Sequence, residues 1–211
     1  MSSIVNIFSS VVPVYNANRG FSLNEKEQQE IDSVIAEGMI QSEGITKQSE
    51  NTFLFDSKLP DLRSFCEEHI ANYVNKVICP KNKSLEFYIT QSWLNVTKQN
   101  EYHVMHNHPN SIISGVYYFT DNSTIIFNSP FAESVSKTIS IESEIYNSWN
   151  FAYYGNCTQT WNKGTLILFP SYLTHRVPKN KSLDVRVSLS FNVFVRGELG
   201  TINNLTYLDL K

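Results

Sequence analysis

The sequence predicts a mainly β, α+β fold in which a sandwich or jelly roll is braced by N-terminal helices. Composition is the first observation: 13 Phe and 11 Tyr in 211 residues favour strands, and frequent Asn and Ser favour turns. The second is a series of short β-branched or aromatic runs separated by Asn, Ser, Pro and Gly. The third is a pair of amphipathic helical patterns near the N-terminus, each of which needs a sheet to cover its apolar stripe.

Residues 1–84 are expected to form an N-terminal strand and a helical brace. The edge strand is expected over residues 4–15. Ser22-Leu-Asn-Glu25 has the pattern of a capping box, which predicts a helix that begins there and ends near Gly38. A second helix is expected over residues 60–78, because a proline suits its first turn and another proline follows its end.

A jelly-roll core is expected over residues 85–196, followed by a C-terminal tail over residues 197–211. Eight runs have strand character, at residues 87–97, 102–108, 112–120, 124–128, 137–141, 165–170, 173–177 and 185–194. Short strands separated by such turn residues favour a sandwich or a jelly roll over a parallel α/β sheet. The aromatic segment 129–162 is typical of a lid or a binding loop. We therefore expect a single domain over residues 1–211.

Charge and cysteine content argue against several classes of protein. Lys and Arg number 17 against 20 Asp and Glu, a net charge of −3 that disfavours general nucleic-acid binding. The three cysteines, Cys66, Cys79 and Cys157, form no CxxC pair, so we expect no cysteine-only zinc site. The sequence shows neither the pattern of a signal peptide nor a run of about 18 apolar residues, so we expect a cytoplasmic protein without a membrane span.

Histidines form the first chemical motif. Only five are present, and His103, His106 and His108 lie within six positions. Residues i and i+2 of a strand face the same side, so His106 and His108 can meet one metal ion, whereas His103 should point away unless a bulge intervenes. His175, about 70 residues later, can complete the set from another strand. Three nitrogens on one face leave coordination positions open, as a catalytic metal requires.

A cation follows these histidines at a defined spacing. Ten residues separate His175 from Arg186, and Ser188 completes the pattern H-x10-R-x-S. Apolar and polar residues alternate along this strand, which places Arg186 and Ser188 together on its polar face. A buried cation without an anion is very unfavourable, and the planar guanidinium suits a carboxylate. An ion pair with Asp184 or Glu198 is the alternative explanation.

Together these motifs resemble the non-haem Fe(II), 2-oxoglutarate-dependent oxygenases. More narrowly, they are similar to the small "putative 2OG-Fe(II) oxygenase" group related to prolyl 4-hydroxylases. The similar stretches are Trp93-Leu-Asn95, His106 to Tyr118, Gly164 to His175, and Arg186-Val-Ser-Leu-Ser-Phe-Asn192, so the resemblance covers residues 85–195. It implies a double-stranded β-helix (a jelly roll) with Fe(II) at its open mouth, and 2-oxoglutarate and O2 as cosubstrates.

The resemblance also implies roles for individual residues. Three residues match the metal ligands: His106, His108 and His175. Position 108 is usually Asp or Glu, so the site would lack one negative charge, unless Glu101 or Asp121 supplies a carboxylate instead. Five residues match the cosubstrate pocket or are candidates for it: Arg186, Ser188, Tyr118, Asn95 and Asn192.

The reaction implied by the family is hydroxylation of a substrate coupled to decarboxylation of 2-oxoglutarate to succinate and CO2. The expected substrate is a small molecule or a peptide residue, such as a prolyl residue, and a homodimer is one oligomeric state open to the chain. Two alternatives stay open: a cupin-like three-histidine metalloenzyme that does not use 2-oxoglutarate, and a non-catalytic jelly-roll binding protein.

Overall fold

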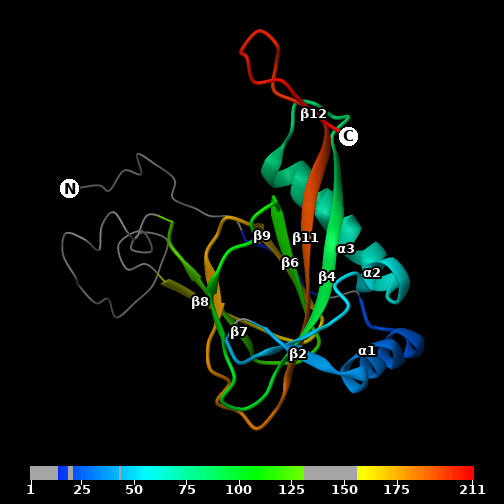
Figure 1. The fold of residues 1–211 in the computed structure, drawn as a ribbon, viewed down its shortest axis with the longest axis vertical. Coiled ribbons are helices and arrows are strands. Elements are labelled where there is room, and N and C mark those ends of the chain that lie inside the picture. Colours follow the sequence, from blue (N-terminus) through cyan, green and yellow to red (C-terminus); the bar gives the residue numbers. More distant parts are fainter. Residues whose placement is uncertain (1–13, 19–20, 43, 131–155) are drawn as a thin grey trace, which may run out of the picture.

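Two antiparallel sheets form the body of the protein in a computed structural model, which describes residues 14–18, 21–42, 44–130 and 156–211 (Figure 1). In order, the larger sheet contains β1 (Tyr15–Asn18), β9 (Thr165–Pro170), β6 (Ile113–Tyr118), β11 (Arg186–Leu199), β4 (Glu86–Thr97), β3 (Lys47–Ser49) and β2 (Met39–Gln41), while β12 (Leu208–Leu210) pairs with β11. The smaller sheet contains β5 (His103–His106), β10 (His175–Val177), β7 (Ser123–Asn128) and β8 (Asn156–Trp161). The predicted jelly-roll class, mainly β, is confirmed.

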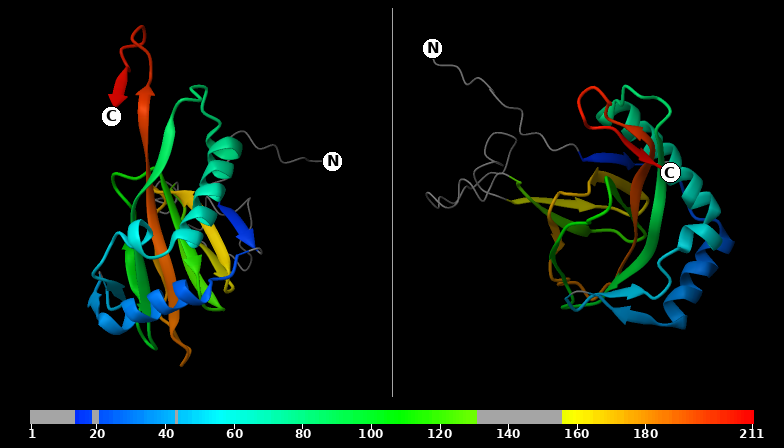
Figure 2. Two further views of the ribbon diagram at one scale, coloured as in Figure 1. Left: turned by 90° about the vertical axis from the view of Figure 1, so that its right-hand side faces the viewer. Right: turned by 45° about the horizontal axis from the view of Figure 1, so that its top comes forward.

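Helices cover the face of the larger sheet that is turned away from the smaller one (Figure 2). They are α1 (Glu25–Glu37), α2 (Leu54–Ser57) and α3 (Pro60–Tyr73), and α3 continues as the π-helical turn η1 (Val74–Ile78). Apolar residues of α3 pack with Leu189, Phe191 and Val193 of β11 in one buried cluster. The brace therefore rests on every second residue of β11, which leaves the alternate residues free to face the other sheet.

The N-terminus of α1 differs from the expected capping box. The cap is Asn24 and not Ser22, because the Asn24 side chain accepts a hydrogen bond of 2.8 Å from the Glu27 backbone N–H. Glu27 is itself buried, and its Oε1 accepts hydrogen bonds from the backbone N–H groups of Asp61 and Leu62, at 2.8 and 3.1 Å. A carboxylate of α1 thus caps α3, which has no side-chain cap from its own N-cap residue.

Some predicted elements differ in extent, and others lie outside the described residues. Residues 4–13 of the strand expected at 4–15 fall outside them, and the described strand β1 begins only at Tyr15. The strand expected at 137–141 also falls outside them, as does most of the segment 129–162. The end of that segment contains a strand, β8, and the expected C-terminal tail contains β12 paired with the end of β11. The hairpin of β2 and β3 was not predicted, because each strand has only three residues and shows no alternation of apolar and polar residues.

A close contact between neighbouring strands sets the position of β11 against β6. Gly115 lies opposite Phe191, and a Cβ atom on Gly115 would lie only 2.1 Å from the Phe191 ring. The absence of a side chain at position 115 therefore makes room for a fully buried aromatic ring.

No helix among the described residues is long and apolar enough to span a membrane.

Candidate metal and cosubstrate site

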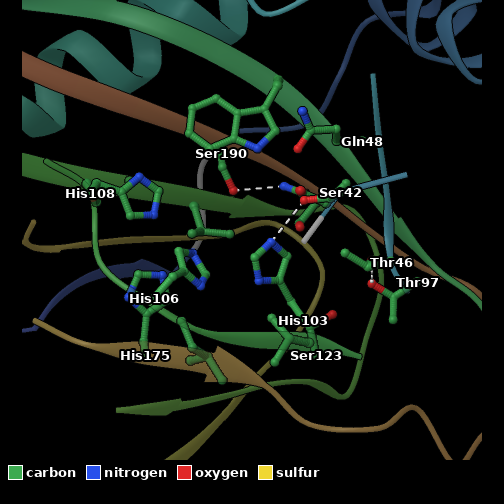
Figure 3. Close-up of a pocket in the computed structure, with 18 of the residues that line it drawn as sticks. Ser42, Thr46, Gln48, Thr97, His103, His106, His108, Ser123, His175 and Ser190 are labelled. Carbon is green, nitrogen blue, oxygen red and sulfur yellow. Dashed lines mark hydrogen bonds between the residues drawn. The ribbon is translucent and has the colours of Figure 1, made fainter. Parts of the chain in front are cut away.

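A cavity of about 610 Å³ lies between the two sheets and receives side chains from both (Figure 3). The larger sheet contributes alternate residues of β4 and β11 together with residues of β6, and the smaller sheet contributes residues of β5, β7 and β10. The β2–β3 hairpin adds polar residues, among them Ser42 and Gln48. Among the described lining residues there is no Asp or Glu, and Arg186 is the only Lys or Arg.

Three imidazoles meet at one end of this cavity. His106 and His175 lie opposite each other in the β5–β10 pair, and His108 follows just after β5. One ligand nitrogen from each ring lies within 4.8 Å of the other two, so His106, His108 and His175 together could hold a metal ion. The structure thus brings together the three histidines that the sequence selected.

Hydrogen bonds determine which nitrogen of each ring is free. The Nδ1 atoms of His106 and His175 lie 2.9 Å from the backbone oxygens of Val104 and Leu173, respectively. Nδ1 of His108 lies 2.7 Å from the side-chain oxygen of Asn192. An amide oxygen can only accept, so each Nδ1 carries the proton and each Nε2 keeps its lone pair.

Burial keeps these imidazoles neutral. It lowers the pKa of His106 to about 4 and that of His175 to about 3, and it also lowers the pKa of His108. A neutral imidazole is the form that binds a metal, and nitrogen ligands of this kind suit Fe(II) among other divalent ions. The donor set therefore fits the metal that the sequence predicted.

His103 also faces the cavity, and a β-bulge is the reason. The register between β5 and β10 shifts from His106 opposite His175 to His103 opposite Val177, which turns His103 to the side of His106. The ring centroids of His103 and His106 are 4.2 Å apart. Both nitrogens of His103 are engaged, at 3.1 Å from the Val104 backbone oxygen and 3.1 Å from Ser42 Oγ, so His103 is not one of the three candidate ligands.

Arg186 lines the same cavity without an acidic partner. Its Nη2 donates a 2.7 Å hydrogen bond to the Pro178 backbone oxygen, whereas its Nε is buried and has no partner among the described residues. Among the described residues, Arg186 forms no ion pair with Asp184 or Glu198. The Asp184 carboxylate accepts instead from Ser182, and that of Glu198 accepts from Tyr207. A buried guanidinium in this state is ready to bind an anion.

Two hydroxyl groups lie on the strands beside this guanidinium. Ser188 is directly opposite Tyr118 in the β11–β6 pair, and both line the cavity. Burial raises the pKa of Tyr118, while the nearby charge of Arg186 acts in the opposite direction. The phenol therefore stays protonated at neutral pH and can donate a hydrogen bond.

The two asparagines have different surroundings. Asn95 donates a 2.9 Å hydrogen bond to Ser190 Oγ on the facing strand, whereas Asn192 accepts from His108. The Asn192 oxygen also lies 3.5 Å from Ser114 Oγ, and this hydroxyl bonds to Ser171 Oγ at 2.9 Å. Sequence reasoning missed these serines, and only their positions beside the histidine motifs could have indicated them.

The structure also resolves whether a nearby acid could replace His108. The Glu101 carboxylate accepts a 2.7 Å hydrogen bond from the Lys98 backbone N–H, and that of Asp121 accepts one of 3.0 Å from the Lys163 backbone N–H. Both acids stabilise turns, and neither lines the cavity. This leaves His108 as the third candidate ligand.

Comparison with known proteins agrees with this geometry. Residues 91–192 match the family described as "Putative 2OG-Fe(II) oxygenase". No curated protein matches the sequence.

Solved structures with a similar fold include two prolyl hydroxylases. The viral collagen prolyl hydroxylase of Paramecium Bursaria Chlorella virus-1, in a 2-oxoglutarate complex, has a TM-score of 0.56 and 12% identity, over 85% of this chain and 94% of that one. A Pseudomonas putida prolyl-4-hydroxylase has a TM-score of 0.58 and 11% identity, over 87% and 94%. SnoK, a non-haem α-ketoglutarate-dependent carbocyclase from nogalamycin biosynthesis, has a TM-score of 0.59 and 11% identity, over 89% and 81%.

At such low identity, the solved structures establish the fold alone. The family match is more specific, because the matched stretch contains all eight residues that the sequence selected for the metal and the cosubstrate. The predicted resemblance is therefore confirmed: residues 91–192 match the family of 2OG-Fe(II) oxygenases.

Proposed function

We propose that this oxygenase hydroxylates a C–H bond of a small molecule or a peptide residue and releases succinate and CO2. His106, His108 and His175 hold Fe(II), and Arg186, Ser188 and Tyr118 bind the distal carboxylate of 2-oxoglutarate. When bound, Fe(II) and 2-oxoglutarate supply the activation of O2, with oxidative decarboxylation of the cosubstrate. The protein supplies position, orientation and shelter from water.

The observation that carries this proposal is the unpartnered Nε of Arg186 in the cavity that also holds the three imidazoles. A dicarboxylate can use one end at the metal and place the other against this guanidinium, whose planar fork matches a carboxylate. The anion would remove the unfavourable state of a buried, uncompensated cation. A cupin-like enzyme that does not use 2-oxoglutarate leaves Arg186 without this explanation.

The remaining residues orient these groups. The Nδ1 hydrogen bonds of the three histidines hold each ring with Nε2 free, so no tautomer change is needed before metal binding. The hydroxyls of Ser188 and Tyr118 can donate to the carboxylate beside Arg186. Asn95 and Asn192 bond to Ser190 and His108, which supports roles in positioning their neighbours more than direct contact with 2-oxoglutarate.

The test is an anaerobic titration of the Fe(II) protein with 2-oxoglutarate, in which the metal-to-ligand charge-transfer absorption of the complex is measured. We expect the band in the wild-type protein. Arg186→Gln, which keeps polarity but removes the charge, should weaken 2-oxoglutarate binding by about a hundredfold, as expected for loss of a charge-assisted hydrogen-bonded pair, and leave Fe(II) affinity unchanged. His175→Ala should abolish Fe(II) binding. A metal-loaded wild-type protein without the band, or an Arg186→Gln variant with unchanged 2-oxoglutarate affinity, would contradict the proposal.

A further inference from the structure

The charges around the cavity restrict the substrate, given the proposed function. Among the described lining residues, Arg186 is the only permanently charged side chain, and the other polar ones are amides, hydroxyls, an indole and imidazoles. The three candidate ligands are neutral imidazoles, so they bring no negative charge to a divalent metal. A substrate cation would therefore find no carboxylate on the described walls.

Charge balance extends this argument. In the proposed complex, one carboxylate of 2-oxoglutarate lies at the metal and the other lies against Arg186. The first carboxylate compensates only one of the two metal charges, and the second compensates the guanidinium. One positive charge is therefore left at the metal, where the surrounding protein screens charges less than bulk water does. A carboxylate at position 108, as is usual in the family, would have removed it.

Neutral hydrogen-bond donors line the cavity wall formed by β4, β11 and β3. The indole of Trp93 stacks on His108 with ring centroids 5.8 Å apart, and its N–H has no hydrogen-bond partner among the described residues. The side-chain amide of Gln48 is also without a hydrogen-bond partner in the described part of the chain. Ser190 Oγ accepts from Asn95, so its own hydroxyl proton is free for a ligand. Figure 3 shows Gln48 and Ser190 on the wall that faces His103 and His106.

We propose that the substrate carries an anionic group, a carboxylate or a phosphate, which lies between the metal and the wall formed by Trp93, Gln48 and Ser190. The uncompensated positive charge attracts this group, and the free N–H and O–H donors bind its oxygens. The inference rests on the proposed function, because the charge balance assumes bound metal and 2-oxoglutarate.

The test uses the Co(II) protein saturated with 2-oxoglutarate, whose visible spectrum reports changes near the metal without turnover. Two matched pairs serve as probes: N-acetylglycine with N-acetylglycinamide, and glycerol phosphate with glycerol. Each anion should perturb the spectrum at a concentration at least about tenfold lower than its neutral counterpart. The pair with the larger ratio of effective concentrations, neutral compound to anion, shows whether the site prefers a carboxylate or a phosphate. Equal effects of anions and neutral counterparts in both pairs would overturn the inference.

Variants separate charge from shape. Gln48→Glu adds one negative charge on the wall and leaves the metal ligands intact, so it should weaken anion binding by about tenfold, while Gln48→Met should not add this repulsion. His108→Asp and His108→Asn make a second pair, which differ by one charge at the metal. If Gln48→Glu binds the anions as well as Gln48→Met, the inference is wrong. If the Co(II) protein does not bind 2-oxoglutarate at all, the proposed function itself fails, and the two failures are thus distinguished.

Discussion

Asn192 should control the metal affinity of this protein without touching the metal. Its side-chain oxygen lies 2.7 Å from Nδ1 of His108, and among the described residues this nitrogen has no other hydrogen-bond acceptor. Asn192→Leu removes the acceptor and keeps a side chain of similar size. The His108 ring then loses the bond that fixes its tautomer and orientation.

The magnitude follows from this bond. Removing a hydrogen-bond partner of a metal ligand reduces metal affinity by about 10- to 100-fold, which equals roughly 1.4–2.8 kcal/mol. Asn192→Asp should act in the opposite direction, because an ionised acceptor makes a stronger hydrogen bond and places a negative charge beside the all-histidine set. We therefore expect Asn192→Asp to bind the metal more tightly than the wild-type protein, and Asn192→Leu to bind it more weakly.

The assay is an anaerobic competition of Fe(II) or Co(II) between the protein and a chelator of known affinity. Asn95→Leu is the matched control, because Asn95 lies in the neighbouring strand and bonds to Ser190 rather than to a histidine. It should leave the metal dissociation constant unchanged. If Asn192→Leu binds metal within twofold of wild type while both variants unfold at similar denaturant concentrations, the positioning role of Asn192 is refuted.

Three further predictions concern stability, each measured by urea denaturation. Glu27→Leu should lower the free energy of unfolding by about 2 kcal/mol, since it leaves two backbone N–H groups of α3 without a cap. An unchanged urea midpoint would show that water replaces the carboxylate. Gly115→Ala should lower the free energy of unfolding by about 1–3 kcal/mol through its clash with the Phe191 ring. Adding Phe191→Leu to this variant should recover part of that loss. Additive effects of the two substitutions would count against the clash. The metal-free protein should lose stability as the pH falls from 6.5 toward 4, because the unfolded chain then binds protons that buried His106 and His175 do not. The free energy of unfolding should fall by up to about 1.4 kcal/mol per pH unit for each histidine. A free energy of unfolding that stays constant over this range would contradict the burial argument.

The sequence was informative where local pattern determines the structure. Strict alternation from Arg186 to Asn192 assigned one face of β11 to the core and the other to the cavity, and the structure agrees. His106 and His108 also face one metal site as expected, although β5 ends at His106 and the strand period does not extend to His108. Such patterns depend only on the period of a strand, so they need no knowledge of the partner strands.

Features that depend on distant partners could not be predicted. The turn of His103 toward the cavity results from a bulge, which is defined only once β5 pairs with β10. The strand around Gln48 has polar neighbours and no alternation, and its pairing with β4 stabilises it. The bond from Asn192 to His108 joins residues 84 positions apart, and no local pattern indicates it.

The contact between Gly115 and Phe191 also has a consequence for the fidelity of folding. Alternation alone would tolerate a shift of β11 by two residues along β6, because such a shift keeps polar side chains in the cavity and apolar ones under the helices. It would, however, move Arg186 and Ser188 by about 7 Å along β6 and break the pairing of Ser188 with Tyr118. The Phe191 ring fits only opposite the residue without a side chain, so a shifted pairing would force it against a larger neighbour. Gly115, which carries no chemical group of its own, thereby selects the one alignment of the two strands in which the anion-binding groups meet.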